Sequence, residues 1–229
     1  MTKRLQALLN MIPMDGIGMI DVGTDHAMVP ISLAQKGYHG KLFASDIHNG
    51  PLQKAKNAAE EAGVAEQISF QLCDGLAFCP PTEIDCILIA GMGGETICRI
   101  LDQAEWIFDR PYHLILQPMT HAEVLRYWLV HNEFQINREE IVLENGQLFQ
   151  LFSASLGKSL RYSDPEYIVG KINGNRSGVS VYELLREEAE LIRKKVNGLS
   201  ESNQNNTEYA FYRKVLTEME MLLQNDYGK

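Results

Sequence analysis

Apolar runs alternate with amphipathic stretches along the first two thirds of the chain. The apolar runs, which are typical of buried strands, lie at 17–23, 42–46, 68–73, 85–90 and 114–117. The amphipathic stretches, which predict helices, lie at 1–12, 27–36, 51–62, 93–106 and 120–132, the last with Thr120 as its cap. This alternation predicts an α/β fold in which helices cover both faces of a mostly parallel sheet.

Two more strand-like runs, at 139–143 and 147–155, flank Asn145-Gly146. Asn-Gly between such runs signals a two-residue hairpin turn, so the sheet is expected to end in an antiparallel edge hairpin. This combination is the layout of the Rossmann-like class I S-adenosylmethionine methyltransferases. A plain dinucleotide-binding fold would more often keep alternating.

The last third of the chain has a different pattern. The polar, glycine-containing segment 153–178 predicts a hinge region. Beyond it, apolar positions recur at helical spacing on both sides of the polar run 200–206, which predicts an antiparallel coiled-coil hairpin. The two stripes are Tyr182, Leu185, Ala189, Ile192 and Val196, and Tyr209, Tyr212, Leu216, Met219 and Leu223. We expect a first domain over 1–157 and a helical second domain over 158–229.

Composition narrows the class of protein. Apolar residues make up 45% of the 229 positions, enough for a buried core. No apolar run approaches the roughly 18 residues that span a bilayer, and the N-terminus lacks a secretory pattern, so we expect a cytoplasmic protein without a membrane partner. The net charge is −9, so RNA binding would need a local basic patch. The spacing of Cys73, Cys79, Cys86 and Cys98 predicts free thiols and no metal site.

Small and acidic residues follow the predicted strands at the edge where open parallel sheets bind ligands. Gly23 lets the backbone after the first strand approach a ligand, close to the amides at the start of the next helix. Asp46 ends the second strand and could accept both hydroxyls of a ribose, or could only cap a helix. Asp74, before Gly75, could accept a hydrogen bond from an adenine amino group, or could only form a turn.

Three glycines in the segment 90–94 follow the fourth strand and allow close backbone approach to a ligand. This segment lacks the Asn/Asp-Pro-Pro-aromatic sequence that many exocyclic-amine methyltransferases carry there, which argues against that chemistry. The fifth strand ends at Gln117-Pro118-Met119 on the same edge. Gln117 could reach a ligand or could only close the strand end.

Together these residues resemble the bacterial tRNA (adenine-N1)-methyltransferases of the TrmK type, which modify the adenine at position 22. The resemblance covers about residues 2–157, with a similar helical tail. The matching stretches are Lys3-Arg4-Leu5-Gln6, 21–27, Gly50-Pro51, Asp74-Gly75-Leu76, 89–94 and 114–118. It implies a Rossmann-like catalytic domain, a C-terminal coiled-coil domain, S-adenosylmethionine as cofactor and tRNA as partner. We expect a monomer or a weak dimer.

The resemblance also implies roles for particular residues. Asp25 is implied as the catalytic acid. Cofactor contacts are implied for Asp21, Gly23, Thr24, His26, Asp46, Ile47, Asp74, Gly75, Ala90, Gly91, Met92 and Gly93. Substrate contacts are implied for Lys3, Arg4, Gln117, Pro118 and Met119. The sequence departs from the family at Met119, where Asn is common, and at Asp46, where Glu is common.

Further cations could contact RNA near the cleft. They are Lys158, Arg161, Lys171 and Arg176 of the hinge region, and Arg193, Lys194 and Lys195 of the helical hairpin. Three other functions stay open. A small-molecule methyltransferase would share the cofactor half, an NAD-dependent oxidoreductase would normally carry a full G-x-G-x-x-G, and an RNA or protein adaptor could keep the fold without catalysis.

Overall fold

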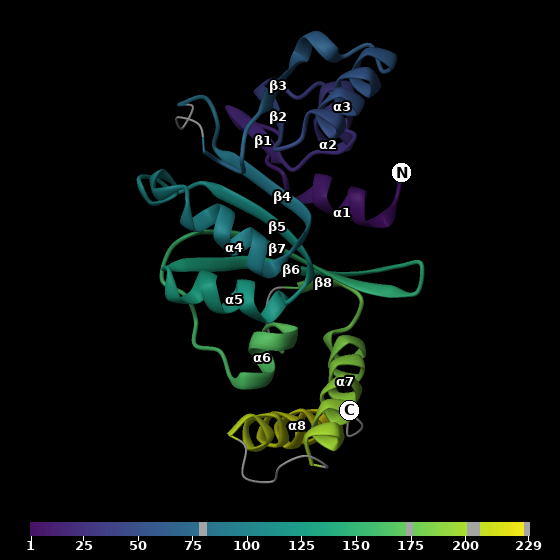
Figure 1. Cartoon of the computed structure of the whole chain (residues 1–229), viewed down its shortest axis with the longest axis vertical. Coiled ribbons are helices and arrows are strands. Elements are labelled where there is room, and N and C mark those ends of the chain that lie inside the picture. The colour runs from purple at the N-terminus through teal and green to yellow at the C-terminus, as the bar shows by residue number, and fades with distance from the viewer. Residues whose placement is uncertain (78–81, 173–175, 201–206, 227–229) are drawn as a thin grey trace.

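One eight-stranded sheet organises the protein in the computed structural model, which describes residues 1–77, 82–172, 176–200 and 207–226 (Figure 1). The strand order is β3-β2-β1-β4-β5-β7-β6-β8. The strands are β1 (Gly18–Val22), β2 (Lys41–Asp46), β3 (Ile68–Leu72), β4 (Cys86–Gly93), β5 (His113–Thr120), β6 (Phe134–Glu144), β7 (Gln147–Leu156) and β8 (Arg176–Gly178). Strands β1 to β5 are mutually parallel, and β7 pairs antiparallel with both β5 and β6.

Helices cover both faces of the sheet, as the alternating pattern predicts. They are α1 (Lys3–Met11), α2 (Met28–Gln35), α3 (Asn49–Glu61), α4 (Gly94–Asp102), α5 (Ala122–His131), α6 (Asp164–Val169), α7 (Val181–Ser200) and α8 (Thr207–Asp226). Helices α1, α2 and α3 pack on one face and α4 and α5 on the other. The predicted fold class, a mostly parallel Rossmann-like sheet with an antiparallel edge, is confirmed.

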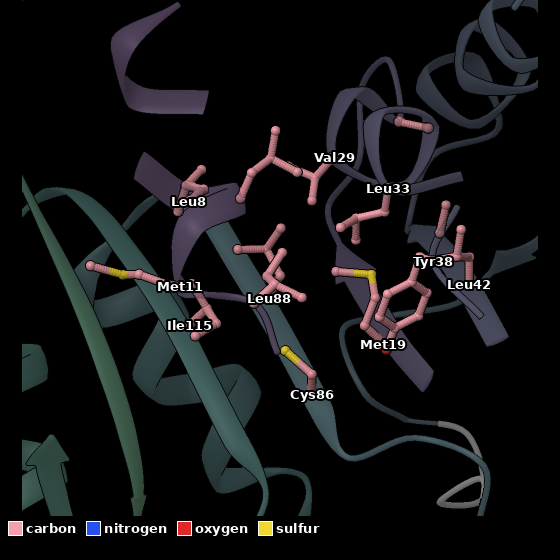
Figure 2. Packing of buried hydrophobic residues seen from close by; sticks show 14 of the residues in the cluster. Leu8, Met11, Met19, Val29, Leu33, Tyr38, Leu42, Cys86, Leu88 and Ile115 are labelled. Carbon is pink, nitrogen blue, oxygen red and sulfur yellow. The ribbon is translucent and has the colours of Figure 1, made fainter. Parts of the chain in front are cut away.

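The first four residues of β4, Cys86 to Ile89, are apolar because both faces of the strand are buried there. Cys86 and Leu88 contribute to the core under α1 and α2, whereas Ile87 and Ile89 face the core under α4 and α5. Figure 2 shows the first of these cores, in which Leu8 of α1 and the strand residues Leu88 and Ile115 belong to one cluster. The two cores together fix the sheet whose edge carries the candidate site.

The edge hairpin forms where the sequence predicts it. Asn145 and Gly146 have φ angles of 51° and 78°, and two positive φ angles in a two-residue turn match the twist of the strands that it joins. Both β4 and β5 run further than predicted, to Gly93 and Thr120. The prediction that Thr120 caps α5 is wrong, because Thr120 pairs within the sheet and His121 takes the cap position with a φ of 54°.

The C-terminal helices α7 and α8 pack against each other and against the sheet. Their shared core contains Leu185, Ile192 and Met219, together with Ile141 of β6 and Val169 of α6. In Figure 1 the two helices run in different directions, and the coiled-coil geometry stays a prediction.

The segment predicted as a hinge holds regular structure. Helix α6 begins with a capping box of Ser163 and Glu166, and β8 pairs in parallel with β6. The division of the chain at 157/158 therefore stays a prediction, because residues beyond it complete the sheet.

A buried ion pair links α6 to the sheet. Arg126 of α5 is 1% exposed, and its guanidinium donates to Glu139 of β6 at 2.9 Å and 3.1 Å and to Gln150 of β7 at 2.8 Å. It also donates to the backbone carbonyls of Tyr167 and Ile168 in α6. One side chain thus joins four elements through charge-assisted hydrogen bonds.

Three of the four cysteines lie within the described residues, and these three are free thiols. Cys86 and Cys98 are buried free thiols, Cys73 is half-buried and free, and Cys79 lies outside the described residues. Burial raises the pKa of the Cys98 thiol to about 12, so it is protonated at neutral pH.

Within the described ranges, no helix is both long and apolar enough to cross a membrane.

Candidate active site

The loop after β1 is held rigidly at the carboxyl end of the sheet. Gly23 takes a φ of +76°, and the amides of Gly23 and Thr24 both donate to the Ser45 carbonyl at the end of β2. The Thr24 hydroxyl accepts a hydrogen bond from the Ala27 amide at 2.9 Å. Ala27 precedes α2 with a φ of 48° and has no polar side chain, so it leaves the amides at the helix start available to an anion.

Two cavities meet at Gly23. The first has a volume of about 370 Å³ and the second about 270 Å³. The first is lined by Thr2, Arg4, Leu5, Leu8, Asp21, Gly23, Thr24, Asp25, His26, Ala27, Met28, Val29, Leu88, Ala90, Gly91 and Gln117. The second is lined by Val22, Gly23, Asp46, Ile47, His48, Pro51, Cys73, Asp74, Gly75, Met92, Thr96, Arg99 and Ile100. A Cβ at Gly23 would lie 1.9 Å from Cε of Met92, which can move aside, and it is the φ of +76° that favours glycine at this position.

The second cavity suits a nucleoside. The buried Asp46 accepts a hydrogen bond from the His48 amide at 2.7 Å through one carboxylate oxygen. Asp74 lies at the same cavity with an exposed side chain, and Gly75 turns the chain there with a φ of +53°. Two carboxylates at one cavity can accept hydrogen bonds from ribose hydroxyls and from an amino group of a base. The hydrogen bond to the His48 amide also fits the alternative in which Asp46 only forms a turn or caps a helix, so its contact with a ribose stays a prediction.

Asp21 brings a buried acid to the wall of the first cavity. Burial, with a smaller contribution from the nearby Asp46, raises the pKa of this carboxyl to about 6, although a hydrogen bond from Thr24 opposes the shift. Buried acids of this kind ionise more readily when a cation binds beside them. Asp21 is therefore suited to a cationic ligand.

Asp25 lies at the open mouth of the first cavity. Its side chain is 59% exposed and stands between two cations or potential cations. One carboxylate oxygen is 3.3 Å from Nε2 of His26, and the other is 3.4 Å from Nζ of Lys54 in α3. An exposed carboxylate at the mouth of a cavity is accessible to a macromolecular substrate.

Gln117 supports the glycine turn after β4. It is 1% exposed, accepts a hydrogen bond from the Gly91 amide at 3.2 Å and donates to the Pro118 carbonyl at 2.7 Å. These bonds match the expectation that Gln117 closes the strand end, and its place in the cavity wall leaves room for the other expectation, contact with a ligand. Gly91 itself has a φ of +80°, which favours glycine.

Helix α1 is anchored over the first cavity. The Arg4 amide donates to Glu144 at 3.1 Å, and the Arg4 guanidinium lies 3.3 Å from the Met119 sulfur and 4.6 Å from the centre of the Phe149 ring. The hydrogen bond from the Arg4 amide holds the pKa of Glu144 below its usual range. The hairpin β6–β7 and the end of β5 thus keep Arg4 at the cavity.

Most of the predicted site residues meet at these two cavities. Lys3 and Gly93 line neither one; Lys3 is exposed on α1, and Gly93 precedes α4 next to the Thr120 hydroxyl. Pro118 and Met119 line a neighbouring cavity of about 400 Å³ between β5, α5 and α7. Their roles in binding stay predictions.

The sequence analysis missed several residues of the site. They are Thr2, Leu8, Met28, Val29, His48, Lys54, Cys73, Leu88, Thr96, Arg99 and Ile100, whereas Leu5, Val22, Ala27 and Pro51 appeared only in the stretches that carry the resemblance. Cys73, next to Asp74, and His48, two residues after Asp46, could have been found from their closeness to a predicted acid. Lys54 had no such signal, because only the fold brings α3 to Asp25. Among the described residues, no group of three or more His, Cys, Asp or Glu side chains could hold a metal ion.

Comparison with known proteins defines the class. Residues 1–152 match the family model described as a methyltransferase domain. The chain is 35% identical over 157 residues to the tRNA (adenine(22)-N(1))-methyltransferase of Bacillus subtilis, a match that covers 69% of this chain and 66% of that protein. The chain therefore belongs to the methyltransferase-domain family.

Solved structures are similar over nearly the whole chain. Mycoplasma capricolum TrmK in complex with S-adenosyl-homocysteine has a TM-score of 0.80 and 26% identity, with 98% of each chain covered. A Streptococcus pneumoniae protein in complex with S-adenosyl-L-methionine has a TM-score of 0.79 and 28% identity, covering 97% of this chain and 99% of that one. The resemblance to TrmK-type enzymes that the sequence predicts is thus confirmed.

Proposed function

We propose that the protein transfers a methyl group from S-adenosylmethionine to N1 of an adenine in tRNA, at position 22. The observation that carries this proposal is the position of Asp25, exposed at one cavity that shares Gly23 with a second cavity lined by two carboxylates. The first cavity offers room for an incoming base, and the second suits a nucleoside. Similarity to tRNA methyltransferases supports the choice of substrate.

The residues present fit S-adenosylmethionine. Asp46 and Asp74 would hold its ribose and adenine, and Asp21 with the open start of α2 would hold the charged amino-acid end. Gly23 and Gly91 let the backbone approach it closely. When bound, this cofactor supplies an electrophilic methyl carbon on a positively charged sulfur.

The acceptor needs positioning more than activation. Adenine N1 has an in-plane lone pair and is mostly unprotonated at neutral pH, so no strong base is required and catalysis depends on orientation. N1 lies on the pairing edge, so the base must be unpaired or flipped out. Methylation leaves the ring cationic, and Asp25 is placed to stabilise that charge or to accept a hydrogen bond from the N6 amino group.

Methylation of bulk tRNA that lacks modifications, followed by nucleoside mass spectrometry, tests the proposal. We expect 1-methyladenosine to appear with S-adenosylmethionine and to be absent when an adenine-to-guanine substitution is made at position 22 of a tRNA transcript. Methylation of small molecules with no product in tRNA would favour a small-molecule methyltransferase. Nicotinamide-cofactor binding, or tRNA binding without transfer, would favour the oxidoreductase or the adaptor.

Cofactor affinity is expected to fall as the pH drops through about 6. Protonation of Asp21, whose pKa burial raises to about 6, removes the negative charge that faces a cationic cofactor. The dissociation constant should rise by up to about tenfold per pH unit below that point. Isothermal titration calorimetry from pH 5 to 8 measures it. Asp21→Asn should bind weakly at every pH with little pH dependence, and a wild-type affinity that is flat from pH 5 to 7 would contradict this role.

Three finer expectations belong to the same proposal. We expect the protein to work in the cytoplasm, where its substrate is found, and to be a monomer or a weak dimer, which light scattering after gel filtration measures. We also expect residues 1–157 to carry catalysis and 158–229 to add contacts to tRNA.

A further inference from the structure

Another cavity lies away from the candidate active site. It has a volume of about 650 Å³ and is lined by Val130, His131, Glu133, Gly157, Lys158, Ser159, Leu160, Arg161, Tyr162 and Tyr167. They come from the last turn of α5, from the segments that precede β6 and follow β7, and from α6. The end of β7 lies beside the start of β5, which places the cavity at the amino ends of the parallel strands. The cavity is therefore at the sheet edge opposite to Asp25. The sequence-based expectation that Lys158 and Arg161 lie near the cleft is wrong.

Aromatic rings form a continuous row at this cavity. The rings of Tyr127 and His131 are stacked with 3.7 Å between centroids. Tyr167 lies 6.5 Å from His131 and 5.6 Å from Tyr127, and Tyr162 lies 5.4 Å from Tyr167. Tyr127 and His131 are exposed, so the row presents ring surface to solvent. Exposed, stacked rings of this kind are platforms on which nucleic-acid bases stack.

Positive charge at the cavity is not cancelled by its surroundings. Lys158 and Arg161 are exposed, and neither has an ion pair within the described ranges of the chain. Two nearby acids are occupied by other cations, Glu166 by Lys171 at 2.7 Å and Asp164 by Lys214 at 2.8 Å. Among the lining residues, Glu133 is the one acid. The chain has a net charge of −9, so two cations that have no ion pair among the described residues and lie beside a row of aromatic rings form a locally basic site on an acidic protein.

We propose that this cavity binds unpaired nucleotides of the tRNA at a point remote from the methylated base. Bases would stack on the exposed ring of His131, and Lys158 and Arg161 would contact phosphates. The inference rests on the proposed function, because it takes tRNA as the ligand. Since the cavity is at the far edge of the sheet, it contributes to the affinity for tRNA and not to the chemical step.

Equilibrium binding of tRNA without cofactor, measured by fluorescence anisotropy at several salt concentrations, tests the inference. The double variant Lys158→Gln/Arg161→Gln should weaken binding about tenfold or more and reduce the magnitude of the slope of log affinity against log salt by about 1.4, since each phosphate contact on a single strand contributes about 0.7. His131→Ala should weaken binding by about 5- to 150-fold through lost stacking and leave the slope unchanged. Lys36→Gln is the matched control, because Lys36 is an exposed cation after α2, on the other face of the sheet.

Steady-state kinetics distinguishes a role of this cavity in tRNA binding from a role in the methyl-transfer step. Each cavity variant should raise the KM for tRNA while leaving kcat and the dissociation constant of the cofactor unchanged, and circular dichroism checks that it folds. If the wild-type protein methylates tRNA and both cavity variants bind tRNA with unchanged affinity, this inference is overturned and the proposed function stands. A wild-type protein that binds tRNA without methylating it would overturn the proposed function, and the same binding data would still decide the inference. No binding of tRNA would overturn both.

Discussion

Asp25→Ala is expected to lower kcat for tRNA methylation by about 10² to 10³ while changing the dissociation constant of the cofactor less than about threefold. Removing one preorganised electrostatic group from a transition state typically costs that factor. Cofactor affinity should persist because Asp46, Asp74 and Asp21 keep their places. Single-turnover methylation and calorimetry measure the two quantities.

Asp25→Asn separates the two possible roles of the carboxylate. If Asp25 stabilises the growing positive charge, the amide should be about as inactive as alanine. If it accepts a hydrogen bond from the N6 amino group, the amide oxygen can still do so, and most activity should return. Glu60→Ala, which removes an exposed acid of α3, serves as the control. Unchanged turnover in Asp25→Ala would remove Asp25 from the mechanism.

Arg126→Met is expected to destabilise the protein by about 3–5 kcal/mol, the usual cost of removing one partner from a buried ion pair. The substitution deprives Glu139 of its guanidinium and removes the donors to Gln150 and to the carbonyls of Tyr167 and Ile168. Urea unfolding followed by circular dichroism measures the loss.

The double variant Arg126→Met/Glu139→Leu tests the cause. Replacing both charges by apolar groups removes the desolvation penalty of the remaining charge, so it should recover a large part of the stability. Lys41→Met is a suitable control, because its ion pair with Glu83 is exposed and exposed pairs contribute little. A loss below about 1 kcal/mol in Arg126→Met would show that the pair is energetically unimportant.

Much of the fold and the site could be predicted because the signals are local. The loop at Gly23, the acid at Asp46 and the turn at Asn145-Gly146 each follow an apolar run of strand length, so strand ends locate them. The end of β4 was misjudged because glycine disfavours strands, yet pairing with β5 carries the strand through Gly91 to Gly93.

Other features depend on contacts that no local pattern reveals. The ion pair of Arg126 with Glu139 joins a helix to a strand, and the approach of Lys54 to Asp25 joins a helix to a loop. Helix α6 had a readable capping box at Ser163 and Glu166, but the polar composition around it favoured a hinge. Strand β8 has only three residues, and its pairing with β6 gives no signal in the sequence.

The β6–β7 hairpin shares a hydrophobic core with the C-terminal helices, and this limits where the chain can be truncated. Ile141 of β6 is 1% exposed only because α6, α7 and α8 cover it, and Arg126 reaches its two carbonyl acceptors only in α6. A chain shortened after Gly157 would expose the apolar face of Ile141 to water and would remove the two α6 carbonyls that accept hydrogen bonds from Arg126, although its ion pair with Glu139 would remain. Loss of activity in such a fragment would report aggregation as readily as lost recognition, so single surface substitutions are the safer route to separate the two.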